Sequence, residues 1–213
     1  MEKVQLENLL RTMSLEEKVM QLVQVPGSAY ARESAVTGVE QESIPEKVRQ
    51  LAGSTLGIME GEKIRAIQEE YMKGHPHHIP LLFMLDVIHG HRTVFPCPLG
   101  QGATFDPDLA EQAAAVQAEE AAADGVHVTF SPMADLVRDA RWGRVMESTG
   151  EDALLNGRMA AAMVRGYQGD DLKDGRRVAS CVKHFAAYGA ADGGRDYNNT
   201  ELSEHTQIGR AHV

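Results

Sequence analysis

The chain has 213 residues, of which 43% are hydrophobic and 24% charged, a composition that is typical of a globular protein and excludes a disordered or low-complexity chain. Domains contain roughly 50 to 250 residues, so this length suits a domain whose core needs no disulfide or metal for stability. The formal net charge of −10 repels phosphate backbones and anionic membrane surfaces, and we therefore expect neither nucleic acid nor a membrane as a partner.

Two features of the sequence bear on its compartment. Cys97 and Cys181 are far apart and form no CxxC motif, which favours a reducing compartment and two small buried side chains over a disulfide. The first residues carry charges where a signal peptide needs an uninterrupted apolar segment, and no later stretch approaches the roughly 20 apolar residues of a membrane span. We expect a cytoplasmic protein, while a periplasmic or secreted location stays open.

Short helices are predicted in the first third of the chain. Ser14 and Glu17 form a capping box that begins a helix extending to Val23. A similar start signal at Ser43 predicts a further helix, and the apolar spacing over 64–71 predicts another.

Four apolar runs of strand length alternate with these helices and with two later ones, over 106–124 and about 151–164. The runs lie near Leu56 and at Leu81–Leu85, Val126–Phe130 and Val178–Val182. Continuous apolar runs are typical of strands that are buried on both faces of a parallel sheet. The alternation predicts an α/β fold, either a doubly wound sheet or a barrel of eight βα units.

Polar side chains follow the predicted strands directly, as Asp86, Ser131 and Lys183 do. Barrel active sites are built at the C-terminal ends of strands, and no glycine-rich phosphate loop follows the first strand, so the barrel is favoured over a dinucleotide-binding sheet. A complete barrel needs eight strands and about 250 residues. We therefore expect a (β/α)8 TIM-type barrel of which this chain forms the N-terminal half, with about four parallel strands and flanking helices.

Histidines are concentrated in two segments. His89 and His91 follow Asp86, so this strand end suits either carboxylate binding of a ligand or a metal held by the two imidazoles. Asp86 as a simple turn cap is the structural alternative. His75, His77 and His78 lie in a proline-broken loop and are expected in a solvated turn.

Two further segments are candidates for ligand binding. The loop 138–144 contains three arginines and the only tryptophan, which suit a sugar ring and its hydroxyls or, alternatively, an ion-pair cluster with acidic residues such as Glu147. Lys183 and His184 lie at the tip of the fourth predicted strand, before an apolar segment interrupted by glycine, which favours burial of the pair.

A series of short motifs runs along the chain in a characteristic order. They are Ser14–Lys18, Asp86–Gly90, Thr104–Pro107, Phe130–Asp135, Arg138–Arg144, Glu147–Ser148, Gly150–Asp152, Lys183–Phe185 and Gly194–Asn198. In this order the chain resembles the glycoside hydrolases of family 3, and most closely the β-glucosidases of that family. The resemblance extends from Leu6 to about Thr206.

The resemblance implies a retaining hydrolase of terminal β-D-glucosyl residues that needs no cofactor and no metal. On the family pattern Asp86 binds distal hydroxyls of a β-glucoside or oligosaccharide, Arg144, Lys183 and His184 bind further hydroxyls, and Arg195 lies near the nucleophile. Charge-assisted hydrogen bonds of about 1.5 to 3 kcal/mol suit such a neutral polyol. Both glucose and xylose stay open as the sugar.

The resemblance also implies a non-proline cis peptide around Lys183–Phe185. The family's N-acetylglucosaminidase branch has a further histidine after this motif, where the present chain reads Ala186–Asp192, so the glucosidase branch is favoured.

The same pattern places the catalytic residues outside this sequence. The nucleophile belongs to a Ser-Asp-Trp-like segment on a later strand, so the nucleophile Asp and the acid/base Glu are expected beyond Val213, in a missing C-terminal half. Residues 1–207 are expected to form an incomplete N-terminal barrel domain without activity of its own. Residues 208–213 resemble a translated sequencing adapter. The alternatives are a metal-dependent barrel hydrolase that uses His89 and His91, and a non-catalytic sugar-binding barrel.

Overall fold

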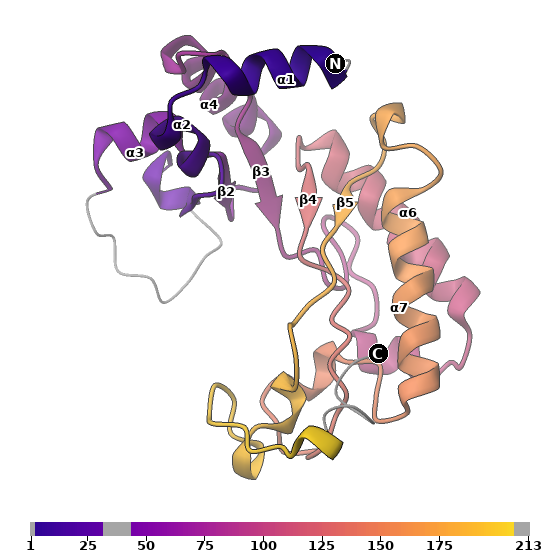
Figure 1. Ribbon diagram of the computed structural model, residues 1–213. Coiled ribbons are helices and arrows are strands. Elements are labelled where there is room, and N and C mark those ends of the chain that lie inside the picture. Colours follow the sequence, from indigo (N-terminus) through magenta and orange to yellow (C-terminus); the bar gives the residue numbers. More distant parts are fainter. Residues whose placement is uncertain (1–2, 32–43, 207–213) are drawn as a thin grey trace. The chain divides into compact units, whose positions relative to one another are not determined.

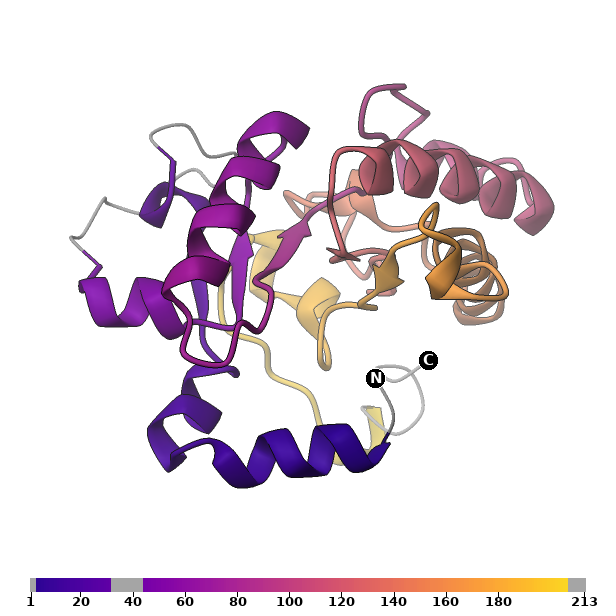
Figure 2. The same cartoon turned by 90° about the horizontal axis from the view of Figure 1, so that it is seen from above.

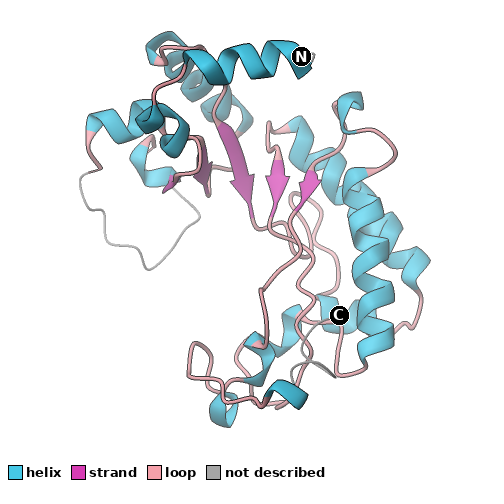
Figure 3. Ribbon diagram, in the orientation of Figure 1, coloured by secondary structure: helices cyan, strands magenta, loops and turns pink. Residues whose placement is uncertain are grey.

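The computed structural model describes residues 3–31 and 44–206, which contain helices and five short strands (Figures 1 and 3). The chain divides into two compact units. The first contains the residues up to Leu85 together with Asp124–His127, and the second contains Asp86–Ala123 and the residues from Val128 onward. Among the described residues, no helix combines the length and the apolar character that crossing a membrane requires.

The first unit contains three parallel strands and most of the predicted short helices. Its elements are α1 (Lys3–Thr12), α2 (Leu15–Met20), β1 (Gln24–Pro26), the 3-10 helix η1 (Gly27–Ala29), α3 (Glu46–Leu51), β2 (Ser54–Leu56), α4 (Gly61–Gly74) and β3 (Leu82–Leu85). β2 pairs with β1 on one side and β3 on the other, so that Thr55 lies between Val25 and Phe83. All three of these side chains are buried and form the centre of this unit.

The predicted capping box at the start of α2 is present. The Ser14 hydroxyl accepts the N–H of Glu17 (3.2 Å), and the Glu17 carboxylate accepts the N–H of Ser14 (2.7 Å). The hydrogen bond from the Ser14 N–H to the carboxylate lowers the pKa of Glu17. The helix ends at Met20 instead of Val23, because the chain turns into β1, a fifth strand that the sequence did not reveal. Three residues ending in a proline are too short to give a periodic signal.

The loop after α4 differs from the predicted solvated turn at His75, whereas His78 is exposed as expected and His77 is half-buried. His75 is 1% exposed, and its Nδ1 atom accepts the N–H of His77 (3.2 Å). Burial lowers the pKa of His75. The ring also lies against Tyr71, with ring centroids 5.4 Å apart. Local sequence shows a polar loop, whereas tertiary packing turns this imidazole inward. Ser43, the predicted start of the next helix, lies outside the described residues, and α3 begins at Glu46.

The second unit contains two parallel strands, β4 (Val128–Thr129) and β5 (Ala179–Ser180), which are shorter than the apolar runs predicted for them. Its other elements are α5 (Pro98–Gly102), α6 (Pro107–Ala123), α7 (Ala153–Gln168) and the 3-10 helices η2 (Val145–Glu147), η3 (Leu172–Asp174), η4 (Tyr188–Ala190) and η5 (Asp192–Gly194). Both strands continue into long loops (Figure 3). The predicted α/β architecture with parallel strands is confirmed in both units.

Helices α6 and α7 lie side by side (Figures 1 and 2). The face of α6 that packs is made of small residues, because Ala110, Ala114, Ala118 and Ala121 are all buried. On α7, Gly166 approaches so closely that a Cβ atom there would lie 2.3 Å from the carbonyl oxygen of Glu111. The alanine-rich sequence of α6 therefore serves close helix packing as well as helix propensity.

The buried Tyr167 of α7 connects the helices to the strand ends. Its single hydroxyl hydrogen is shared between the carbonyl of Val87 (2.6 Å) and the side-chain oxygen of Gln117 on α6 (2.9 Å). It accepts a hydrogen bond from Ser131 (3.2 Å), which follows β4. These bonds fix the segments that leave Asp86 and β4 against the helical layer.

The cysteines differ from the prediction in their burial. Both are free thiols, as expected, but Cys181 is exposed and Cys97 is only half-buried. Cys181 directly follows the two-residue strand β5, where the chain has already left the packed core.

Candidate functional site

The candidate site is formed by the loops that follow β4 and β5 in the second unit. The two loops keep a parallel pairing beyond the strands, since Lys183 N–H donates to Pro132 (3.1 Å) and Ala134 N–H donates to Lys183 (2.8 Å). This register places Asp135 next to His184. The Lys183–His184 peptide bond is cis, as predicted, and so is Ser131–Pro132.

Lys183 and Asp86 form the first polar pair of the site. The Lys183 ammonium donates to the Asp86 carboxylate, which comes from the loop directly after β3. The lysine side chain is 13% exposed and the aspartate side chain 45% exposed. One group of the pair is thus held within the fold while the other is open to solvent and available to a ligand.

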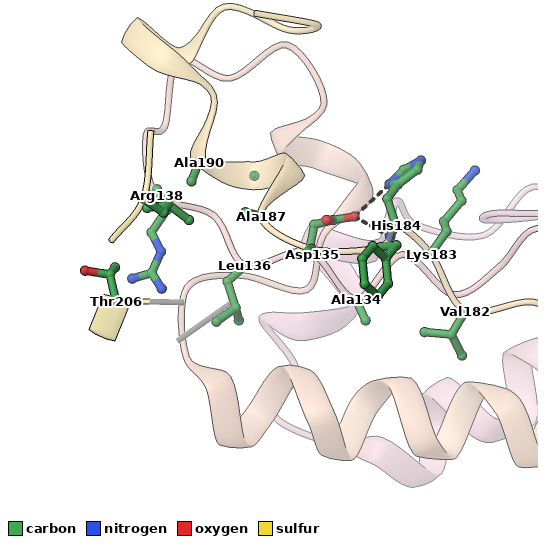
Figure 4. A pocket seen from close by; sticks show the side chains of 14 residues that line it. Ala134, Asp135, Leu136, Arg138, Val182, Lys183, His184, Ala187, Ala190 and Thr206 are labelled. Atoms are coloured by element: carbon green, nitrogen blue, oxygen red, sulfur yellow. Dashed lines mark hydrogen bonds and ion pairs between the residues drawn. The ribbon is translucent and has the colours of Figure 1, made fainter. Parts of the chain in front are cut away.

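His184 lies between an acidic and a basic side chain. Its Nδ1 atom is 2.8 Å from Asp135 Oδ2, and its backbone N–H donates to the same oxygen (3.0 Å). Its Nε2 atom is 3.3 Å from the Nη1 atom of Arg144. Figure 4 shows the Asp135 carboxylate directed at His184, and it shows the side chain of Lys183, the preceding residue.

Arg144 is itself held in place by an ion pair and an aromatic ring. Glu147 accepts two hydrogen bonds from the guanidinium, at 2.8 and 2.6 Å. These bonds raise the pKa of Arg144. The guanidinium also lies over the ring of Tyr188, 5.4 Å from its centroid. The expected ion pair with Glu147 is therefore present, and it orients Arg144 toward His184.

Trp142 is not a platform for a sugar ring, contrary to one of the two interpretations of its loop. The indole is 1% exposed, and its N–H donates to Asp196 (2.9 Å). The ring packs edge-on against Tyr188, with centroids 5.4 Å apart. An aromatic residue in a polar loop suits a ligand surface or a local core equally well, and only the tertiary packing distinguishes them.

A cavity of about 120 Å³ adjoins this cluster (Figure 4). Its lining includes Asp135, Lys183 and His184 from the cluster, and Arg138, Leu202 and Thr206 from segments nearby. Its wall is therefore made of both charged and apolar side chains, which is the mixture that small-molecule sites use.

The structure brings together four of the five predicted site residues and leaves out the fifth. Asp86 with Lys183, and Arg144 with His184, form two donor and acceptor pairs on adjoining loops. Arg195 is exposed, and within the described residues its side chain has no bond to the other four. Its backbone N–H donates to Asp192 (3.3 Å), and its carbonyl accepts the N–H of Asn198 (3.0 Å). The roles of these residues in binding a sugar stay predictions.

The histidines of the metal alternative are not grouped with further ligands in the part of the chain that the structure describes, where no three His, Cys, Asp or Glu side chains form a possible metal site. The Nδ1 atom of His89 lies 3.2 Å from the carbonyl oxygen of Phe95.

The sequence analysis assigned no role to Tyr188 and Asp196, two residues that organise the site. Tyr188 contacts both His184, at 4.6 Å between ring centroids, and Arg144. Its hydroxyl donates to Asp196 (2.7 Å). Asp196 lies in the motif Gly194–Asn198, but its hydrogen bond to Trp142 joins residues that are distant in the sequence.

Residues 14–208 match the model of the glycosyl hydrolase family 3 N terminal domain. The chain belongs to glycosyl hydrolase family 3. The expectation of an α/β fold of the barrel type is confirmed with it.

Relatives of this family 3 chain include glucosidases from several organisms. It is 39% identical to the periplasmic beta-glucosidase of Salmonella typhimurium over 197 residues, which are 92% of this chain and 25% of the relative. It is 46% identical to the beta-glucosidase of Listeria innocua crystallised with isofagomine, with a TM-score of 0.91 over 98% of this chain and 29% of that one.

A more distant structure is the exo-1,3/1,4-beta-glucanase of Pseudoalteromonas, with 31% identity, a TM-score of 0.81 and coverage of 98% of this chain and 28% of that one. The family 3 chain thus spans between a quarter and a third of the length of these relatives. The expected domain bounds stay a prediction, and residues 208–213 lie outside the described residues.

Proposed function

We propose that this family 3 chain supplies part of the sugar-binding site of a retaining β-glucosidase, which releases terminal β-D-glucosyl residues. The observation that carries the proposal is the convergence of two donor and acceptor pairs, Lys183 with Asp86 and Arg144 with His184, on loops of the second unit. The solved structures of the Listeria innocua relative include complexes with glucose and with laminaribiose, which supports a sugar ligand.

The chemistry of the pairs suits hydroxyl groups. Each sugar hydroxyl both donates and accepts a hydrogen bond, so a neighbouring cationic donor and anionic or imidazole acceptor can satisfy it completely. The formal charges nearly cancel across the site, because Asp86 faces Lys183 and Glu147 faces Arg144. A locally balanced site favours a neutral polyol over a charged ligand.

The catalytic carboxylates belong, on this proposal, to another part of the protein. Retaining glycosidases need two carboxyl groups about 5 to 5.5 Å apart, one as nucleophile and one as acid/base. The three carboxylates of the site are engaged with a lysine, a histidine and an arginine, which suits binding and orientation. They are Asp86, Asp135 and Glu147.

A β-xylosidase activity is the second candidate, because a putative beta-xylosidase of Formosa agariphila is also 39% identical to the chain. That match covers 61% of the chain, against 92% for the Salmonella glucosidase, and so favours glucose.

The Salmonella relative is named as periplasmic, whereas we expected a cytoplasmic protein from the sequence. Cell fractionation of the host tests the location.

The test begins with the gene sequence downstream of this chain, where we expect a Ser-Asp-Trp-like segment. The complete gene product should hydrolyse nitrophenyl β-glucoside faster than nitrophenyl β-xyloside, with retention at the anomeric carbon and with no loss after chelation. The isolated 213-residue chain should hydrolyse the substrate no faster than the buffer does.

Hydrolysis by the isolated chain, abolished by one Asp or Glu substitution within it, would overturn the assignment of the catalytic groups. Zinc-dependent activity would support the metal alternative, and sugar binding without hydrolysis the non-catalytic barrel.

A further inference from the structure

His184 is constrained at three points by groups of different chemistry. Asp135 contacts both the ring Nδ1 and the backbone N–H, Arg144 faces Nε2, and the Tyr188 ring packs edge-on at 4.6 Å between centroids. The Asp135 side chain is 3% exposed, so water does not compete for its contact with the ring. The rotation of the imidazole is thus fixed from opposite sides.

These neighbours permit only one protonation state of the ring that satisfies both nitrogens. A carboxylate only accepts hydrogen bonds, and a guanidinium only donates them. Nδ1 must therefore carry the proton that Asp135 accepts, while Nε2 must present a lone pair to Arg144. An imidazolium, or the opposite tautomer, would place two N–H groups against each other at the 3.3 Å contact with Arg144.

We propose that Asp135 is a positioning residue that holds His184 as the neutral Nδ1–H tautomer, so that Nε2 stays a hydrogen-bond acceptor for a hydroxyl of the substrate. This inference rests on the proposed function. A hydroxyl that binds here takes the place of the direct contact between Arg144 and Nε2: it donates to the lone pair of Nε2 and accepts from Arg144. The site therefore binds one hydroxyl both as a hydrogen-bond donor and as an acceptor.

Asp135 is well placed for this role because its own position is fixed independently of the histidine. Its carbonyl accepts the hydroxyl of Ser148 (2.6 Å), which anchors the backbone of the loop. Both bonds to His184 end on the same oxygen, Oδ2. An asparagine amide oxygen can therefore replace it at the same point, whereas alanine removes both bonds.

The first test measures the tautomer directly in the complete gene product with ¹⁵N-labelled histidine, the signals of His184 being assigned by their loss in His184→Ala. In the wild type and in Asp135→Asn, the proton should reside on Nδ1. In Asp135→Ala, the Nδ1–H group loses its acceptor and the ring is free to rotate away from Arg144, so the Nε2–H form should become populated. The exposed Asp171→Asn is the matched control and should leave the spectrum unchanged. An unchanged Nδ1–H signal in Asp135→Ala would overturn the proposal.

The second test separates positioning from a general structural role. Asp135→Ala should lower kcat/KM for nitrophenyl β-glucoside at least about tenfold, and Asp135→Asn should recover most of that loss. In the His184→Ala background, Asp135→Ala should cause no further loss, because its effect passes through the ring. Losses that multiply in the double variant would show that Asp135 acts elsewhere and would contradict the proposal.

Failure of the proposed function and failure of the tautomer inference give different experimental results. A complete protein that hydrolyses no β-glucoside contradicts the proposed function, while the ¹⁵N measurement still decides the tautomer. If Asp135→Ala does not fold, Asp135→Asn in comparison with Asp135→Ser still tests the requirement, since serine is too short to place an acceptor at the same point. A wild-type tautomer in Asp135→Ser would then overturn the inference.

Discussion

The indole N–H of Trp142 donates a 2.9 Å hydrogen bond to the carboxylate of Asp196, 54 residues further along the chain. The same carboxylate oxygen accepts the hydroxyl of Tyr188 (2.7 Å). Burial raises the pKa of Tyr188, so the phenol keeps the proton that it donates. One acidic residue thus ties the loop after β4 to the segment after β5 and holds the ring that lies against His184 and Arg144.

Asp196→Ala should destabilise the second unit, because it leaves the buried Trp142 N–H without an acceptor. An unsatisfied buried donor costs about 1 to 3 kcal/mol. Trp142 is the only tryptophan, so its fluorescence in the 213-residue chain reports the change without interference. We expect a red-shifted emission and a lower urea midpoint. Asp192→Ala, at an exposed position of the same segment, is the control, and an equal effect in both variants would contradict the role of Asp196.

Gly166→Ala should separate α6 from α7. The new Cβ atom would lie 2.3 Å from the Glu111 carbonyl and 2.7 Å from the Ala114 Cβ atom, so the helices must move apart. Overpacking of this kind costs about 1 to 3 kcal/mol. Gly74→Ala is the matched control, because its Cβ atom would meet nothing within 4 Å. Thermal unfolding should show a lower Tm for Gly166→Ala alone; a Tm equal to that of Gly74→Ala would refute the close approach.

Stability should fall at alkaline pH because of Tyr167. Burial raises the pKa of Tyr167 to about 12, whereas an unfolded tyrosine ionises near about 10. The folded state thus retains a proton that the unfolded state loses. The free energy of unfolding should therefore be independent of this group below about pH 10 and decrease between about pH 10 and about pH 12. Burial raises the pKa of Tyr71 to about 12 as well, which adds to the slope.

Tyr167→Phe tests this linkage. The variant should lose about 1 to 3 kcal/mol at neutral pH, since it leaves the Val87 carbonyl and Gln117 without their donor, and its alkaline slope should be smaller. Urea unfolding as a function of pH measures both quantities. Tyr197→Phe, at an exposed site, should have the stability of the wild type at neutral pH. A slope that Tyr167→Phe leaves unchanged would assign the alkaline loss to other groups.

Asp86→Ala should affect activity far more than stability. The carboxylate is 45% exposed but Lys183 is only 13% exposed, so loss of the pair should cost stability only modestly, about 1 kcal/mol. If Asp86 orients the sugar, kcat/KM of the complete gene product should fall about 100-fold or more, since misplaced substrates lose rates of that order. Glu69→Ala removes a solvent-exposed ion pair, with Arg65, and should leave kcat/KM unchanged. Wild-type kinetics in Asp86→Ala would refute the binding role.

The sequence alone predicted features that depend on a few neighbouring residues or on a continuous apolar run. The capping box of Ser14 and Glu17 is a four-residue pattern of side chain and backbone, and it forms as expected. The alternation of apolar runs with helices determined the α/β class, because burial on both faces of a strand leaves a continuous apolar segment. Polar residues directly after such runs, such as Asp86 and Lys183, were candidates because parallel strands end at the same edge.

Only the tertiary structure decided which polar residues meet and which way their side chains turn. β1 was missed, because three residues give no periodicity and its pairing partner in β2 lies 30 residues further along. Trp142 and His75 are polar-loop residues in sequence but are buried by segments distant in the chain. The pairing of Asp135 with His184 depends on the parallel register of two loops after β4 and β5. Such contacts are set by packing of the whole unit, and residue spacing along the chain does not predict them.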